Sequence, residues 1–137
     1  MNLDMVPDLA MRGQDDPHGR PVAPRPPTVG QLASRVRRLV TRPGDWWHLV
    51  TFGDEPVRVP LDEGVWLMVW PPGHRSGVEG PEVSAVVAGE LAEVTIDGDG
   101  VTERPLRGSR VQVRGGATAR ELVNLGPAYA VTLHASA

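Results

Sequence analysis

Residues 90–106 read ELAEVTIDGDGVTERPL and have the pattern of one β-hairpin. The central letters DGDG, at positions 97–100, predict the turn, because aspartate and glycine tolerate the positive φ angles that tight hairpin turns require. The flanking runs are rich in β-branched residues and predict strands over 90–96 and 101–106. Such a hairpin is typical of an antiparallel β protein.

The sequence on both sides of the hairpin also has the pattern of short β-strands. Residues 110–114, RVQVR, alternate polar and apolar letters, which predicts a strand with one face in water and one on a core. Eight short strands within about 80 residues, with no helix between them, favour an antiparallel sandwich or a small barrel. Besides the hairpin, the predicted strands are 57–61, 65–70, 83–88, 110–114, 119–124 and 129–135.

A helix precedes the predicted strands. Residues 28–31, TVGQ, match a capping box in which Thr28 and Gln31 satisfy each other's backbone amides. Apolar residues follow at helical spacing up to residue 40, and Pro-Gly at 43–44 ends the pattern. Residues 1–27 carry six prolines and few clustered aliphatic side chains, which predicts a disordered tail. We therefore expect one domain over residues 28–137.

Composition excludes several classes of protein. The chain has 137 residues, no cysteine and a formal net charge of −3. The absence of cysteine rules out disulfides, thiolate metal sites and a cysteine nucleophile. A mildly acidic chain without a clustered basic face gives no reason to expect nucleic acid as a partner. With no apolar run long enough for a membrane span and no basic leader, the expected location is the cytoplasm, away from membranes.

Four stretches resemble the cysteine dioxygenase branch of the cupins. They are VWLMVWPPGHRSGV at 65–78, VVAGELAE at 86–93, LVN at 122–124 and AVTLH at 130–134. The resemblance extends over residues 28–137 and implies a small all-β cupin jelly-roll barrel with one N-terminal helix. It also implies the activity of that family, in which Fe(II) held by three histidines adds O2 to a small thiol such as cysteine.

The ligand positions of that family carry other residues here. By motif spacing, Glu79 stands at the first histidine, the second is missing, and Arg120 stands at the third. A guanidinium has no lone pair to give a metal, so we expect a metal-free, catalytically degenerate cupin. In this interpretation Glu79 or Glu82 neutralises Arg120. The barrel then binds a small anionic molecule or a protein partner, with Arg120 and Arg58 toward the anion and Trp70 lining the site.

In two further interpretations the protein is an enzyme. One is an iron-dependent thiol dioxygenase with an unusual ligand set of His74, Glu79 and Glu82, because histidine and carboxylates together bind iron. The other is a metal-free isomerase that uses carboxylate and histidine acid–base pairs.

Other residues leave two questions open. Thr132 and His134 match the Ser-x-His part of a proton relay in the resembled family, although Ser136 stands where the family has tyrosine. They are the candidate catalytic residues. Strand 110–114 is a candidate edge strand, so a homodimer through that edge stays open on fold-level analogy.

Overall fold

The computed structural model describes residues 25–78, 80–106, 108–115 and 119–137. One α-helix comes first, followed by two short 3-10 helices and then nine strands. The elements are α1 (Val29–Val40), η1 (Pro43–Asp45), η2 (Trp47–Leu49), β1 (Val57–Asp62), β2 (Val65–Trp70), β3 (Arg75–Val78), β4 (Glu82–Ala88), β5 (Leu91–Asp97), β6 (Gly100–Leu106), β7 (Val111–Arg114), β8 (Ala119–Val123) and β9 (Ala130–Ala135).

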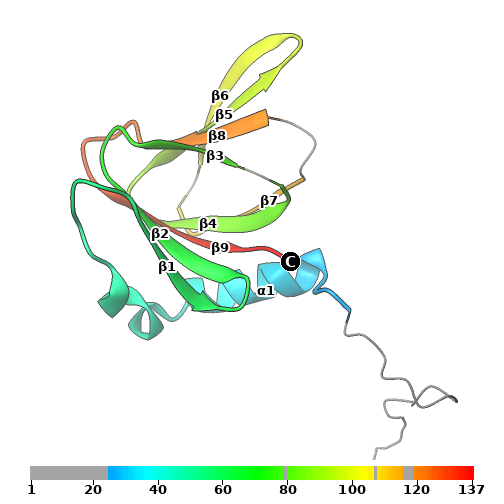
Figure 1. Ribbon diagram of the computed structural model, residues 1–137, viewed down its shortest axis with the longest axis vertical. Helices are drawn as coiled ribbons and strands as arrows, with labels where there is room; N and C mark the ends of the chain where they lie inside the picture. The colour runs from blue at the N-terminus through cyan, green and yellow to red at the C-terminus, as the bar shows by residue number, and fades with distance from the viewer. Residues whose placement is uncertain (1–24, 79, 107, 116–118) are drawn as a thin grey trace, which may run out of the picture.

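The strands form two antiparallel sheets that face each other (Figure 1). Sheet A has the order β1-β2-β9-β4-β7 and sheet B the order β3-β8-β5-β6. The predicted hairpin is β5–β6, with Asp97 paired to Gly100 across the turn. The predicted all-β domain is therefore confirmed, and β7 is an edge strand as expected. A homodimer through that edge stays a prediction.

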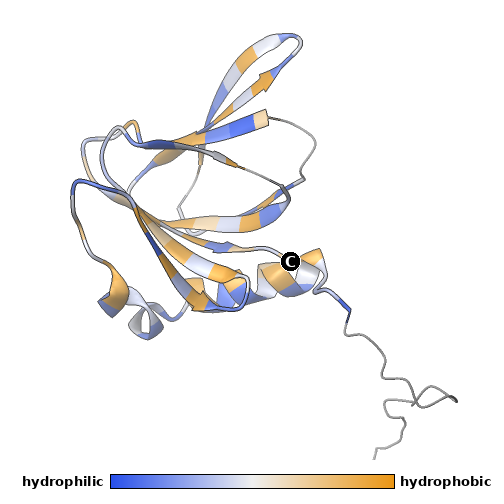
Figure 2. Cartoon of the chain, in the orientation of Figure 1, coloured by the Kyte–Doolittle hydropathy of each residue, from blue (hydrophilic) through white to orange (hydrophobic). Residues whose placement is uncertain are grey.

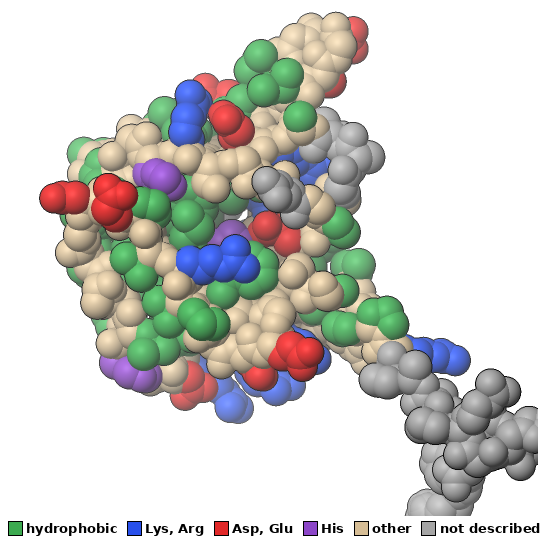
Figure 3. Space-filling view, viewed as in Figure 1, with side chains coloured by type: hydrophobic (Ala, Val, Ile, Leu, Met, Phe, Trp, Pro, Cys, Tyr) green, Lys and Arg blue, Asp and Glu red, His purple; other side chains and the backbone are tan. Residues whose placement is uncertain are grey.

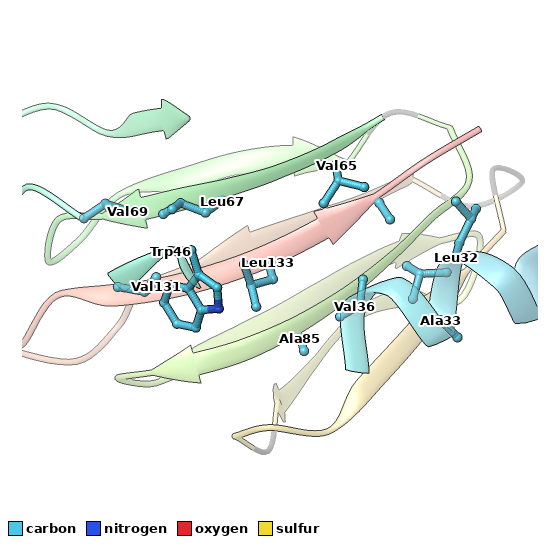
Figure 4. Close-up of a cluster of buried hydrophobic side chains, with 12 residues drawn as sticks. Leu32, Ala33, Val36, Trp46, Val65, Leu67, Val69, Ala85, Val131 and Leu133 are labelled. Atoms are coloured by element: carbon cyan, nitrogen blue, oxygen red, sulfur yellow. The ribbon is translucent and has the colours of Figure 1, made fainter. Parts of the chain in front are cut away.

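Helix α1 begins as the capping box predicts. Thr28 Oγ1 accepts from the Gln31 amide at 3.1 Å, and Gln31 Oε1 accepts from the Thr28 amide at 2.9 Å. The buried residues of α1 are Leu32, Ala33 and Val36, and in Figure 4 they point toward the outer face of sheet A. This helix therefore covers one face of sheet A and leaves the other face to the space between the sheets.

Side chains of sheet A alternate between these two faces, because successive residues of a strand point in opposite directions. Figure 2 shows hydrophilic and hydrophobic residues alternating along the strands. On β2, Val65, Leu67 and Val69 belong to the same outer cluster as the buried residues of α1 and Trp46, whereas Trp70 belongs to a second cluster between the sheets. That inner cluster consists of Trp70, Val86, Leu91, Leu106, Leu122 and Ala130.

The turn between β4 and β5 depends on a glycine. Gly89 has a φ of +74°, in the region that L side chains rarely adopt, and a Cβ there would collide with the backbone of Tyr129 and Ala130. This glycine belongs to the stretch 86–93 that carries the family resemblance. It brings the end of β4 against the start of β9, which adjoins β4 in sheet A.

The structure adds one strand to those that the sequence predicts. Strand β3 was not predicted, since RSGV at 75–78 has few β-branched residues, and it pairs with β8 along the edge of sheet B. Most of the predicted disordered tail lies outside the described residues. Among the helices of the described part, none is long and apolar enough to cross a membrane.

Candidate functional site

The space between the sheets has a polar end and an apolar end. On β5 and β8 the inward side chains change from Leu91 and Leu122 to Glu93 and Arg120 two residues along. Figure 3 shows a hollow between the two sheets, with basic, acidic and histidine side chains around it. We call the inward polar residues the polar cluster: Glu82, Ser84, Glu93, Arg104, Arg114, Arg120, Thr132 and His134.

The carboxylate of Glu93 is the centre of the polar cluster. Its side chain is only 5% exposed, and three guanidiniums surround it. Arg114 Nε donates to Oε1 at 2.9 Å, and Arg104 Nη2 approaches the same oxygen at 3.3 Å. Arg120 Nε lies 3.8 Å from Oε2, within ion-pair range but beyond hydrogen-bond range. One carboxylate therefore contacts three cations in this part of the barrel and neutralises only one of their charges.

Arg114 links the two sheets and leaves one donor unused. Its side chain is 1% exposed. Because Arg114 lies on β7 of sheet A, its bond to Glu93 on β5 joins sheet A to sheet B. The Nη1 atom donates to Ser84 Oγ. Within the described part of the chain, Arg114 Nη2 and Arg120 Nε are buried without a hydrogen-bond partner.

Such unpaired donors are costly. A buried N–H that loses its water and gains no acceptor costs about 1–3 kcal/mol, and more when the group is charged. Most buried polar groups in proteins have a partner for this reason. The two unused donors of the polar cluster flank one carboxylate, so they mark a place where an additional acceptor would be stabilised.

A second unit of the polar cluster is a hydrogen-bonded chain. The Trp70 indole N–H donates to Thr132 Oγ1 at 2.8 Å. Thr132 Oγ1 lies 2.6 Å from His134 Nε2, and His134 Nδ1 lies 2.6 Å from Glu82 Oε2. An ionised carboxylate only accepts, so Nδ1 carries the proton toward Glu82. In the neutral ring the threonine hydroxyl then donates to Nε2.

An aromatic stack covers this chain at the rim. The Trp66 and His134 rings are parallel to within 2°, with centroids 5.1 Å apart. The Arg58 guanidinium lies 4.1 Å from the Trp66 ring centroid on an exposed side chain, a favourable cation–π contact. Arg58 is thus near the polar cluster, as expected, but it stacks on an indole and is not part of the ion pairs around Glu93.

The structure corrects one of the two predicted partners of Arg120, Glu82. Arg120 contacts Glu93, whereas the carboxylate of Glu82 is hydrogen-bonded to His134. The reason is register: Ser84, two residues from Glu82 on the same face of β4, pairs with His134, whereas Glu93 lies on β5 beside β8, which carries Arg120. The other predicted partner of Arg120, Glu79, lies outside the described residues.

The two candidate catalytic residues are in contact. Thr132 and His134 are connected through the Nε2 atom of the ring, and Glu82 from β4 contacts its Nδ1 atom. The sequence pattern does not indicate this contact with Glu82. Trp70 is 1% exposed and forms the floor of the site as well as a donor to Thr132.

The residues at the centre do not suit a metal ion. In residues 25–78, 80–106, 108–115 and 119–137, no group of three or more histidine, aspartate or glutamate side chains could hold one. His74 lies against Trp70, with ring centroids 5.6 Å apart, while Glu82 is committed to His134. Guanidinium N–H groups offer a cation no lone pairs. The free groups around Glu93 are therefore hydrogen-bond donors and not metal ligands.

Sequence reasoning missed Ser84, Glu93, Arg104 and Arg114. In the sequence, Glu93 stands within the stretch 86–93, and Arg114 stands at the end of the alternating strand 110–114. A usable signal was present, because Glu93 shares its strand face with Leu91, an inward residue. An acid on the apolar face of a strand requires a buried partner, which only the pairing of sheets could identify.

The sequence matches no protein-family model and no curated protein. Among solved structures, TT1209 from Thermus thermophilus is 14% identical, with 65% of this chain and 91% of that chain covered and a TM-score of 0.53. Drosophila melanogaster CENP-C bound to CAL1 is 13% identical, with coverages of 76% and 98% and a TM-score of 0.50. The CENP-C cupin domain alone is 14% identical, with 81% of this chain and 100% of that chain covered and a TM-score of 0.49. The chain has the cupin fold.

Oxalate oxidase in complex with the substrate analogue glycolate is also similar in structure. It is 17% identical, with 61% of this chain covered and a TM-score of 0.48. This chain spans about half of the oxalate oxidase chain, with 51% of its length covered. At these identities the likeness concerns the fold alone.

Proposed function

We propose that this chain is a divergent cupin of the cysteine dioxygenase type that works without iron and binds a small anionic molecule between its two sheets. The observation that carries the proposal is the excess of guanidinium groups around Glu93, with unused buried donors on Arg114 and Arg120. By motif spacing, Arg120 stands at the third metal-ligand position of the resembled family.

Electrostatics favours an anion over a ferrous ion at this position. Two unit charges 4 Å apart interact by roughly 4 kcal/mol at the effective dielectric constant of a partly buried site. A divalent cation beside Arg120 is therefore repelled, whereas an oxyanion is attracted and also satisfies the free N–H donors. The same residues that exclude the metal create the binding energy for the anion.

A small ligand fits these groups better than a protein partner. Arg114 is fully enclosed between the sheets, and only Arg120 at 22% and Arg104 at 58% side-chain exposure reach solvent. A protein surface contacts exposed side chains, whereas the unused donors are buried. We therefore place the ligand inside the barrel mouth, next to Arg120.

The test compares anion binding with iron binding in the purified full-length protein. Acetate, phosphate and sulfate are each titrated by calorimetry, and the protein is separately incubated with Fe2+, desalted and analysed for metal. We expect binding of at least one anion, weakened about tenfold or more by Arg120→Gln, because a charge-assisted hydrogen bond is lost. Near-stoichiometric iron, or oxygen uptake with cysteine, would contradict the proposal and favour the thiol dioxygenase.

Arg75→Gln is the matched control for Arg120→Gln. Arg75 lies on β3, which pairs with β8, but its side chain is 59% exposed and contacts Glu121 instead of the polar cluster. We expect this variant to bind anions as the wild type does. An equal loss of anion affinity in both variants would indicate general surface electrostatics and would contradict a site between the sheets.

A metal-free acid–base enzyme is the second candidate, favoured by the 2.6 Å contact between His134 Nδ1 and Glu82 Oε2. A carboxylate that orients an imidazole is a frequent arrangement for proton transfer. Proton NMR of bound small carboxylic acids in D2O tests it. Loss of the α-proton signal, abolished by His134→Gln, supports this function. Unchanged α-protons over a day argue against it.

A further inference from the structure

We propose that the ligand is a monocarboxylate held by Arg114 and Arg120, and that Glu93 sets this preference by its own charge. The proposal rests on the proposed function and narrows it to one ligand class. It follows from three features of the polar cluster: the two free donors, the charge balance and the close packing of the apolar residues beneath it.

The two free donors suit a carboxylate group. A guanidinium N–H forms a charge-assisted hydrogen bond to a carboxylate oxygen, and the two oxygens of one carboxylate can accept from two different guanidiniums. Arg114 already binds one carboxylate, that of Glu93, through Nε at 2.9 Å. Its Nη2 and the Nε of Arg120 are the donors left for a second acceptor among the described residues. Because both arginines contact the same glutamate, we assign the two free donors to one site.

The charge balance selects a monoanion. Among the described residues of the polar cluster, the charged groups are the guanidiniums of Arg104, Arg114 and Arg120 and the carboxylates of Glu82 and Glu93. With a neutral His134, three cations and two anions leave one positive charge. A monocarboxylate neutralises it, whereas sulfate or a phosphate dianion leaves one uncompensated negative charge in a poorly hydrated space, which is unfavourable.

The packing beneath the polar cluster favours a small ligand. There the inner apolar cluster is close-packed, with Trp70, Val86 and Leu122 each at most 2% exposed. A ligand held by the two arginines therefore extends toward the rim, where Trp66 and the exposed Arg58 lie. This arrangement favours an acid with a short side chain.

The first experiment uses the wild-type protein and needs no variant. Calorimetric titrations at about pH 8, where histidine is ordinarily neutral, compare acetate and propionate with sulfate, and acetamide serves as the uncharged analogue of acetate. We expect binding of the carboxylates, sulfate weaker by about tenfold or more, and no binding of acetamide. Sulfate binding equal to or tighter than acetate overturns the monocarboxylate assignment but leaves the proposed function intact. No binding of any anion overturns both.

The second experiment changes the charge of the site. Glu93→Gln raises the net charge of the cluster from one to two, so we expect sulfate affinity to rise by about tenfold or more relative to acetate. Glu121→Gln is the matched control, because Glu121 is on β8 but pairs with Arg75 away from the cluster. An unchanged ratio of sulfate to acetate affinity in Glu93→Gln refutes the role of Glu93.

A third variant covers the case in which Glu93→Gln does not fold. Arg104→Gln removes one positive charge from a side chain that is 58% exposed, so the fold should tolerate it. The cluster then has no net charge, and we expect acetate to bind about threefold to tenfold more weakly. Acetate affinity equal to that of the wild type contradicts the charge balance described here.

Discussion

Replacing Arg114 by methionine removes a buried cation while keeping a side chain of similar length. Two hydrogen bonds are lost, from Nε to Glu93 Oε1 at 2.9 Å and from Nη1 to Ser84 Oγ. The first is charge-assisted and contributes about 1.5–3 kcal/mol, and the second contributes about 1 kcal/mol. The unused Nη2 donor disappears as well, which returns about 1–2 kcal/mol. We expect the free energy of unfolding to fall by about 2 kcal/mol.

Urea denaturation followed by tryptophan fluorescence measures this change. Arg104→Met is the matched control, since Arg104 contacts the same oxygen of Glu93 at 3.3 Å from a side chain that is 58% exposed. Exposed ion pairs contribute about 0–1 kcal/mol, so the control should lose less than about 0.5 kcal/mol. A loss in Arg114→Met no greater than in Arg104→Met would refute the assignment of Arg114 as the main partner of Glu93.

The same two variants separate a purely structural role of Arg114 from a role in binding. A ligand that binds only the native state stabilises it by about 2.7 kcal/mol when its concentration is 100 times the dissociation constant. Saturating carboxylate should therefore raise the urea midpoint of the wild type but leave that of Arg114→Met unchanged. Equal stabilisation of both proteins would place the anion elsewhere.

Three further predictions concern the fold and the hydrogen-bonded chain. Thr132→Val leaves the Trp70 N–H and one His134 nitrogen without partners. We therefore expect the free energy of unfolding, measured by urea denaturation, to fall by about 2–4 kcal/mol, and a fall below about 1 kcal/mol would contradict the hydrogen-bonded arrangement. Gly89→Ala should lower the midpoint of thermal unfolding by about 10 °C or more, since the residue has φ +74° and backbone contacts; Gly98→Ala, with open space around it, should not. Thr28→Ala removes the N-terminal cap of α1 and should lower the free energy of unfolding in urea by about 1 kcal/mol. An unchanged free energy of unfolding would mean that α1 does not depend on this cap.

Local patterns predicted the elements of this fold well. The capping box at Thr28 and the turn at 97–100 were both predictable, because each depends on residues that are neighbours in sequence. Strand β3 was not, because its stability comes from pairing with β8, some 45 residues away, and not from its own composition. Strand β3 therefore forms because of its pairing with β8, which the sequence of residues 75–78 does not indicate.

The candidate site was only partly predictable for the same reason. Arg120 could be identified by motif spacing, but its partner Glu93 depends on how β5 lies beside β8. Likewise, Glu82 was placed at a motif position, and its contact with His134 depends on the register of β4 against β9. Sequence spacing identifies which residues replace the metal ligands, whereas only the sheet pairing shows which charges they meet.

The most direct measurement is a pair of crystal structures, one from crystals grown in acetate and one from crystals soaked anaerobically in Fe2+. We predict density for a carboxylate within hydrogen-bond distance of Arg114 Nη2 and Arg120 Nε, and no anomalous iron signal between the sheets. An iron ion between the sheets, bound by Glu82 or His134 with the Arg120 side chain turned to solvent, would contradict the account.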